Sequence, residues 1–137
     1  MLKIDSLSNE KIKLCAKIMS SSKHRKQQGM FFLEGLRLCR DAAITGCGIE
    51  FAFFTRKAIE TKPEAIELIS KASSQYFEIS DQVAAKLSLT ESSQGFYCLC
   101  RIEHKNVEIH SDGKYIALEN IQDPSNLGAI CRTAEAL

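Results

Sequence analysis

The first hundred residues switch repeatedly between two spacings of apolar side chains, one of about 3.6 residues and one of about two. The longer spacing predicts helices over residues 9–19 and 36–44, a third helix that begins near Pro63, and a short fourth helix that runs from Asp81, as its cap, to Leu87. Each helix has one apolar face, which must be buried against another element. The segments between the helices are therefore expected to supply a sheet.

Four short segments between these helices have the apolar and aromatic composition of buried strands. They are residues 30–35, 49–55, 75–80 and 96–103. Strands that alternate with helices predict an α/β fold, here a sandwich of the three-layer type with a mainly parallel or mixed sheet. The aromatic residues occur at strand spacing, so core packing is expected for them rather than stacking on bases. They are Phe31, Phe32, Phe53, Phe54, Phe96 and Tyr97.

Two polar segments interrupt the apolar pattern. Residues 20–29, with the sequence SSSKHRKQQG, predict a solvated loop with a basic centre. Residues 104–114 contain the turn sequence Asp112-Gly113 and predict a linker after the sandwich. We therefore divide the chain into a first domain over residues 1–103, this linker, and a second segment.

The second segment, residues 115–137, contains the pattern of one strand and one helix. Residues 115–120 predict the strand, and the helix that follows carries an apolar stripe at spacings of three, four and seven. The stripe consists of Leu127, Ile130, Cys131 and Ala134. One strand and one helix cannot close a hydrophobic core, because the helix needs a larger sheet to cover its apolar face. The segment is therefore expected to be the beginning of a second domain.

The charge and apolar content of the chain exclude several classes of protein. Among 137 residues, 18 are basic and 17 acidic, so the net charge of +1 excludes binding of polyanions by bulk charge alone. An apolar content of 45% is enough for a real core, and no apolar run reaches the roughly 18 residues that a membrane span requires. We expect a globular cytoplasmic protein without a membrane partner, whose affinity for nucleic acid would come from local clusters of charge.

The cysteines do not predict a disulfide framework or a metal site. They occur within apolar patterns, without a CxxC pair, and their spacing from histidine does not suit zinc. His104 and His110 in the linker are too far apart to suggest a metal site or a catalytic base. We expect reduced and mostly buried thiols at Cys15, Cys39, Cys47, Cys98, Cys100 and Cys131.

The start of the last helix has candidate chemistry of its own. Asp123 or Asn126 can cap the free N–H groups of the helix, and Pro124 is tolerated in its first turn. Arg132 lies more than about 100° from the centre of the apolar stripe and is available to an anion, a partner or a substrate. A solvated arginine behind an ordinary helix cap is the simpler interpretation of the same residues. A nucleotide-binding α/β fold is disfavoured, because neither GxGxxG nor GxxxxGK[ST] occurs.

Taken together, the spaced residues of this helix resemble a known motif. The sequence DPSNLGAICRTAEAL is similar to the first signature motif of the SpoU (TrmH-like) family of RNA ribose 2′-O-methyltransferases. Earlier in the chain, KHRKQQGMFFLEGLRL and LTESSQGFYCLC resemble two segments of the substrate-binding domain that precedes the catalytic domain in that family. The positions that match the signature motif are Asp123, Pro124, Asn126, Gly128, Ala129, Arg132, Thr133 and Ala134.

This resemblance implies different functions for the two parts of the chain. Residues 1–103 would be a ribosomal-protein-like domain that binds structured RNA, ribosomal RNA above all, and residues 115–137 would be the truncated start of a SPOUT catalytic domain with a trefoil knot. Asn126 and Arg132 match the family's catalytic pair. The family uses S-adenosylmethionine and forms homodimers through the catalytic domain. The later motifs that hold the cofactor are absent here, so we expect these 137 residues neither to bind it nor to catalyse methyl transfer.

The resemblance also points to a set of RNA-binding residues. They are Lys23, His24, Arg25, Lys26 and Arg37. Phosphate contacts need mobile cations on an exposed segment, although a basic run of this kind is often only solvated surface. Glu34 is expected to be a structural anion that pairs with Arg25 or Arg37, and Gln94 and Gly95 are expected to shape a turn. A ribosomal-protein-like RNA-binding module without catalysis remains the alternative for the chain as a whole.

Overall fold

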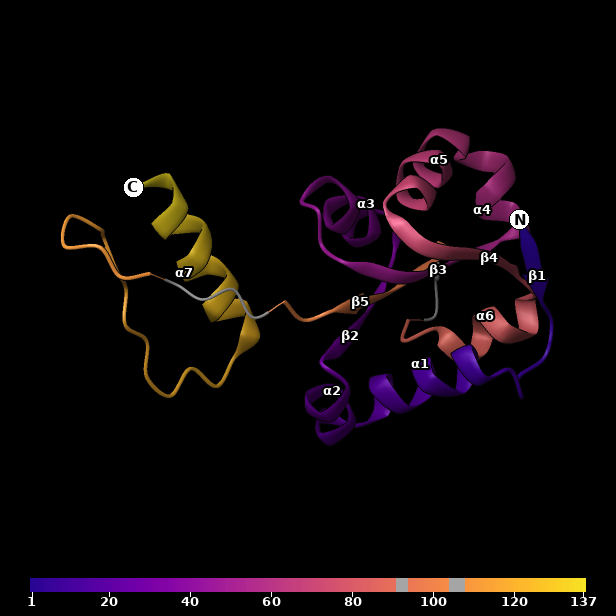
Figure 1. The fold of residues 1–137 in the computed structure, drawn as a ribbon, viewed down its shortest axis with the longest axis horizontal. Helices are drawn as coiled ribbons and strands as arrows, with labels where there is room; N and C mark the ends of the chain where they lie inside the picture. The colour runs from indigo at the N-terminus through magenta and orange to yellow at the C-terminus, as the bar shows by residue number, and fades with distance from the viewer. Residues whose placement is uncertain (91–93, 104–107) are drawn as a thin grey trace. The chain divides into compact units, whose positions relative to one another are not determined.

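The structure is a computed structural model that describes residues 1–90, 94–103 and 108–137 (Figure 1). The chain forms two compact units, Met1–His104 and Lys105–Leu137. The first unit contains a five-stranded sheet in the order β1-β4-β3-β5-β2. Its strands are β1 (Leu2–Ile4), β2 (Met30–Glu34), β3 (Ile49–Thr55), β4 (Ser73–Ile79) and β5 (Phe96–Arg101).

The sheet is mixed, as the sequence predicted. Strands β1 and β3 both pair in parallel with β4, whereas β5 is antiparallel to its neighbours β3 and β2. As a result, β2, β3, β4 and β1 run in the same direction, and their carboxyl ends meet at one edge of the sheet. The sequence did not reveal β1, because three residues are too few to display a period.

Helices cover both faces of the sheet, which gives the expected three layers (Figure 1). On one face lie α1 (Glu10–Ser20) and α6 (Asp81–Leu87), and α2 (Ser22–Gln28) adjoins α1. On the other face lie α3 (Leu36–Ile44), α4 (Arg56–Thr61) and α5 (Pro63–Lys71). The sequence did not predict α4, and Ser80 rather than Asp81 caps α6, because the Ser80 side chain accepts the Val83 N–H.

Side chains that alternate along the central strands form a separate core on each face of the sheet. Phe53 and Tyr97 pack with Ile12 and Ile18 beneath α1, whereas Phe54 packs on the opposite face beneath α3 and α4. The expectation of core packing for the six named aromatics is confirmed, since all six are buried or half-buried. The cores also contain four buried cysteines, and all six cysteines are free thiols, as expected.

The predicted loop over residues 20–29 is wrong, because most of it forms helix α2. The Ser21 hydroxyl accepts the His24 N–H at the start of the helix. At its end, Gly29 has a left-handed φ of 59° and donates its N–H to the Arg25 carbonyl. A helix of seven residues has too few turns to show an apolar period, so its two caps determine it locally.

The second unit contains one regular element among its described residues, helix α7 (Pro124–Ala136). The predicted strand over 115–120 is wrong: this segment is exposed and irregular, and Asn120 has a φ of 52°. A strand requires a neighbour for its N–H and C=O groups, and the described part of this unit supplies none. The predicted turn is confirmed, since the Gly113 N–H donates to the His110 carbonyl.

Candidate RNA-binding surface and motif helix

Helix α2 divides the predicted basic cluster into exposed and inward-facing residues. Lys23 and Lys26 are exposed, three positions apart on one side of the helix. His24 and Arg25 are half-buried. The two lysines are therefore the cations of this helix that are free to contact a polyanion.

Arg25 has structural partners in the neighbouring helix. Its guanidinium Nη1 donates to the Ile18 carbonyl at 2.9 Å and to the Met19 carbonyl at 3.3 Å. These carbonyls belong to the last turn of α1, where backbone oxygens lack partners within the helix and attract a cation. The His24 side chain also turns inward, and its Nδ1 is buried without a partner among the described residues.

Arg37 does not join this cluster. It lies in the first turn of α3, which follows the carboxyl end of β2, whereas α2 precedes the amino end of the same strand. A strand of five residues separates the two positions by about 16 Å. The Arg37 side chain is 93% exposed, and its Nε lies 3.9 Å from an Asp41 carboxylate oxygen.

The predicted pairing of Glu34 with an arginine is wrong. Its carboxylate accepts the Leu89 backbone N–H at 2.6 Å and the Thr90 hydroxyl at 2.8 Å. From the other side of the same region, the Gln94 side-chain oxygen accepts the Leu36 N–H at 2.9 Å. Residues far apart in the sequence thus link the turn between β2 and α3 to the segment that leads into β5.

Gly95 completes this junction at the carboxyl edge of the sheet. It has a left-handed φ of 78°, and a Cβ at this position would lie 2.1 Å from the Thr55 hydroxyl oxygen. The structural role expected for Gln94 and Gly95 is therefore confirmed. Sequence reasoning did not find the connection between Glu34 and this segment. The sign of it in the sequence was that Glu34-Gly35 and Gln94-Gly95 occur in the two segments that resemble the family's substrate-binding domain.

Helix α7 presents the predicted catalytic pair to solvent. Asp123 caps the helix by accepting the Ser125 N–H at 2.8 Å, so Asn126 is not the cap, and its side chain is exposed. Arg132 is also exposed, six residues further along the helix. At about 100° per residue, the two side chains lie about 120° apart around the axis. The helix alone does not bring them onto one face.

The apolar stripe of α7 is only partly covered within its own unit. No residue of this helix is fully buried; Leu127 is 43% exposed, whereas Ile130 and Ala134 are half-buried. Among the described residues there is no cluster of three metal-ligating side chains. Within the same ranges, no helix combines the length and the apolar content needed to cross a bilayer. His104 lies outside the described residues.

The chain is similar to RNA-modifying enzymes in sequence and in structure. A methyltransferase of Synechocystis sp., named as acting on tRNA or rRNA and as uncharacterized, is 32% identical over 120 residues, which are 86% of this chain and 43% of the relative. The 23S rRNA (guanosine(2553)-2′-O)-methyltransferase of Bacillus subtilis is 28% identical over 137 residues, 99% of this chain and 51% of the relative. The chain thus spans about half the length of these curated relatives.

A solved structure has the same fold. An rRNA methyltransferase from Sinorhizobium meliloti is 25% identical, with a TM-score of 0.74 over 98% of this chain and 51% of that one. The AdoMet-bound form of that enzyme gives a TM-score of 0.74 at 23% identity, over 98% of this chain and 50% of that one. Residues 9–98 match the family described as the MRM3-like substrate binding domain. The chain therefore belongs to the SpoU (TrmH-like) family of RNA methyltransferases, within which residues 9–98 form the substrate-binding domain.

Proposed function

We propose that residues 1–103 are the RNA-recognition domain of an S-adenosylmethionine-dependent RNA ribose 2′-O-methyltransferase that acts in the cytoplasm on structured RNA, with ribosomal RNA as its substrate. In this proposal, residues 104–114 are a linker, and residues 115–137 begin a homodimeric catalytic domain with a trefoil knot. The observation that carries the proposal is the family match over residues 9–98, which is followed by the spaced Asp-Pro, Asn and Arg motif at the start of α7.

The RNA contacts of the proposed function follow from what α2 exposes. Lys23 and Lys26 would contact phosphate oxygens, because they are exposed lysines on a helix without acidic residues. His24 and Arg25 belong to the same cluster, but they face the protein and would support it. Arg37 would be a separate contact at the opposite end of β2.

The proposed chemistry gives Asn126 and Arg132 roles in positioning the substrate. Methyl transfer from a sulfonium to a ribose hydroxyl requires an in-line approach and removal of the hydroxyl proton. A guanidinium has five N–H donors and no acceptor, so Arg132 would orient the ribose and its 3′ phosphate by charge-assisted hydrogen bonds rather than take the proton. The exposure of both side chains on α7 leaves them accessible to such a substrate.

Methyl transfer from labelled S-adenosylmethionine to ribosomal RNA tests this proposal. We expect transfer by the full-length gene product that carries this chain, and its loss in the Arg132→Ala and Asn126→Ala variants. Residues 1–137 alone are expected to show no transfer and no cofactor binding. A full-length protein that methylates neither ribosomal nor transfer RNA would refute the proposed activity.

A second candidate function is an RNA-binding module without catalysis. It is favoured by the hydrophobic cores of the first unit, because every residue of these cores lies at or before the end of β5 and none belongs to residues 115–137. In this case, RNA affinity would survive deletion of residues 115–137, and restoring a downstream sequence would add no methyl transfer. The labelled transfer assay therefore separates the two candidates.

A further inference from the structure

After Glu10, the first residue of α1, the rest of α1 and all of α2 carry only positive charge. Between Glu10 and Glu34 the sequence contains no acidic residue. Six basic residues lie in this interval: Lys11, Lys13, Lys17, Lys23, Arg25 and Lys26. In a chain with a net charge of +1, this is a marked local excess of positive charge. The structure shows which of these cations are already engaged.

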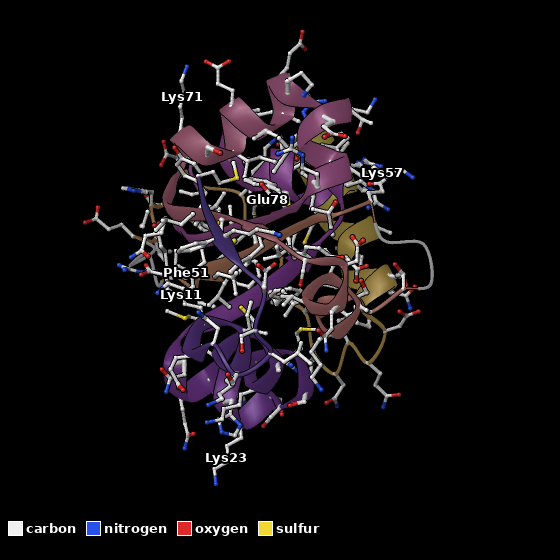
Figure 2. All side chains as sticks on the ribbon, turned by 90° about the vertical axis from the view of Figure 1, so that its right-hand side faces the viewer. Lys11, Lys23, Phe51, Lys57, Lys71 and Glu78 are labelled. Carbon is white, nitrogen blue, oxygen red and sulfur yellow. The ribbon has the colours of Figure 1, made fainter. Side chains whose placement is uncertain are left out.

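Three of the six cations have partners within the fold. Lys11 Nζ lies 5.2 Å from the centroid of the Phe51 ring and 5.5 Å from that of Phe77, an arrangement visible at the left of Figure 2 for Phe51. Lys13 Nζ lies 2.8 Å from a Glu10 carboxylate oxygen. Arg25 is bonded to two carbonyls at the end of α1.

The other three cations are Lys17, Lys23 and Lys26. All three are exposed, and none forms an ion pair with a described residue. Lys17 lies in the last turn of α1, on the side opposite the buried Ile12, Cys15 and Ile18. In Figure 2, Lys23 points away from the body of the domain.

Arg25 determines how the helices that carry these lysines are joined. Only Ser21 separates α1 from α2, and the Arg25 guanidinium donates back across this junction to Ile18 and Met19. Two charge-assisted hydrogen bonds from one planar group restrict the orientation of α2 on α1. Lys23 and Lys26 are therefore held in a fixed relation to Lys17.

We infer that Lys17, Lys23 and Lys26 form one contact surface for an RNA phosphate backbone across the junction of α1 and α2, and that Arg25 is its positioning residue. The inference rests on the proposed RNA-binding function and extends it to α1. Phosphate groups suit this surface because three flexible ammonium groups, none of them in an ion pair with a described carboxylate, can each displace a counterion. Arg25 contributes by fixing α2 and does not itself contact RNA.

Salt-dependent binding of a fluorescein-labelled ribosomal RNA hairpin to the full 137-residue chain tests the surface. Each phosphate contact that is removed should lower the slope of log affinity against log salt by roughly 0.7 to 0.9. The Lys17→Gln variant should lose one such step, and the Lys23→Gln/Lys26→Gln variant two. The matched control is Lys57→Gln, an exposed lysine on α4 in the other helix layer, which should leave the slope unchanged (Figure 2).

The outcomes separate this inference from the proposed function. If Lys17→Gln behaves like Lys57→Gln while the α2 double variant loses slope, α1 is not part of the surface, although the domain still binds RNA. Equal losses from all four lysines would also overturn the inference, because binding would then depend on overall charge. A wild-type chain without salt-dependent RNA binding would contradict the proposed function itself.

The role of Arg25 is tested with a variant that keeps its charge. Arg25→Lys should bind the hairpin more weakly, with faster amide hydrogen exchange in α2, because a rotatable ammonium group on a flexible stem does not hold its donors in the fixed plane from which the guanidinium Nη1 reaches both carbonyls. Lys23→Arg should bind as the wild type does, since a phosphate contact needs only the charge. The positioning role would be refuted if Arg25→Lys retained full affinity, or if Lys23→Arg lost as much.

Discussion

Replacement of Gly95 by alanine is expected to destabilise the first unit far more than its small size suggests. Gly95 has a φ of 78°, and its added methyl carbon would lie 2.1 Å from the Thr55 hydroxyl oxygen and 3.2 Å from the Ala58 Cβ. The left-handed conformation alone costs an alanine about 1–2 kcal/mol. The collision adds a second cost, because real Cβ atoms do not approach other heavy atoms so closely.

The second cost can be estimated from what Thr55 does. Its hydroxyl accepts the Ala58 N–H and caps α4, and the Thr55 backbone N–H donates to the Gly95 carbonyl at 3.0 Å. Moving this hydroxyl weakens a helix cap, at about 1 kcal/mol, and forces a buried region to rearrange, at about 1–3 kcal/mol. The total expected loss of unfolding free energy is therefore about 3–6 kcal/mol.

Gly46→Ala is the matched control for this measurement. Gly46 has a similar φ of 71°, but no heavy atom lies within 4 Å of an added Cβ, so only the backbone cost of about 1–2 kcal/mol applies. In urea unfolding followed by circular dichroism, Gly95→Ala should lower the midpoint about 1 M more than Gly46→Ala does, given slopes of about 1–3 kcal/mol per M. Equal midpoints for the two variants would refute the steric argument.

Three further predictions concern the hydrogen bonds of Glu34, the thiol of Cys15 and the cap of helix α7. Glu34→Gln should lower the unfolding free energy by about 1–3 kcal/mol in urea, because charge-assisted bonds to the Leu89 N–H and the Thr90 hydroxyl are weakened. Burial raises the pKa of the Cys15 thiol to about 12, so the folded state keeps this proton while the unfolded chain loses it above about pH 8.5. The urea midpoint should therefore fall as pH rises from about 8.5 toward 12. This fall should be smaller in Cys15→Ala. The hydrogen bond from the Ser125 backbone N–H holds the pKa of the Asp123 carboxyl below its usual value. The helicity of α7 should therefore be constant near neutral pH and decrease as pH falls through the range of an ordinary aspartate. Asp123→Ala should show no such decrease.

The sequence by itself determined those elements whose pattern is long and local. The helix over 36–44 and the strand over 49–55 have the bounds that their periodicity predicted, since each shows several repeats of its spacing. The free cysteines and the core aromatics follow from composition in the same way. The motif at α7 was also readable, because its spaced residues lie within a single helix.

Tertiary structure alone decided which distant residues meet. Glu34 finds its partners 55 and 56 positions away, and the strand β2 separates Arg37 from the basic helix that lies near it in the sequence. The orientation of Arg25 toward the end of α1 depends on how two short helices join, and no periodicity encodes that. The segment 115–120 has the composition of a strand but no partner strand among the described residues of its own unit, because backbone pairing is a property of two segments and not of one.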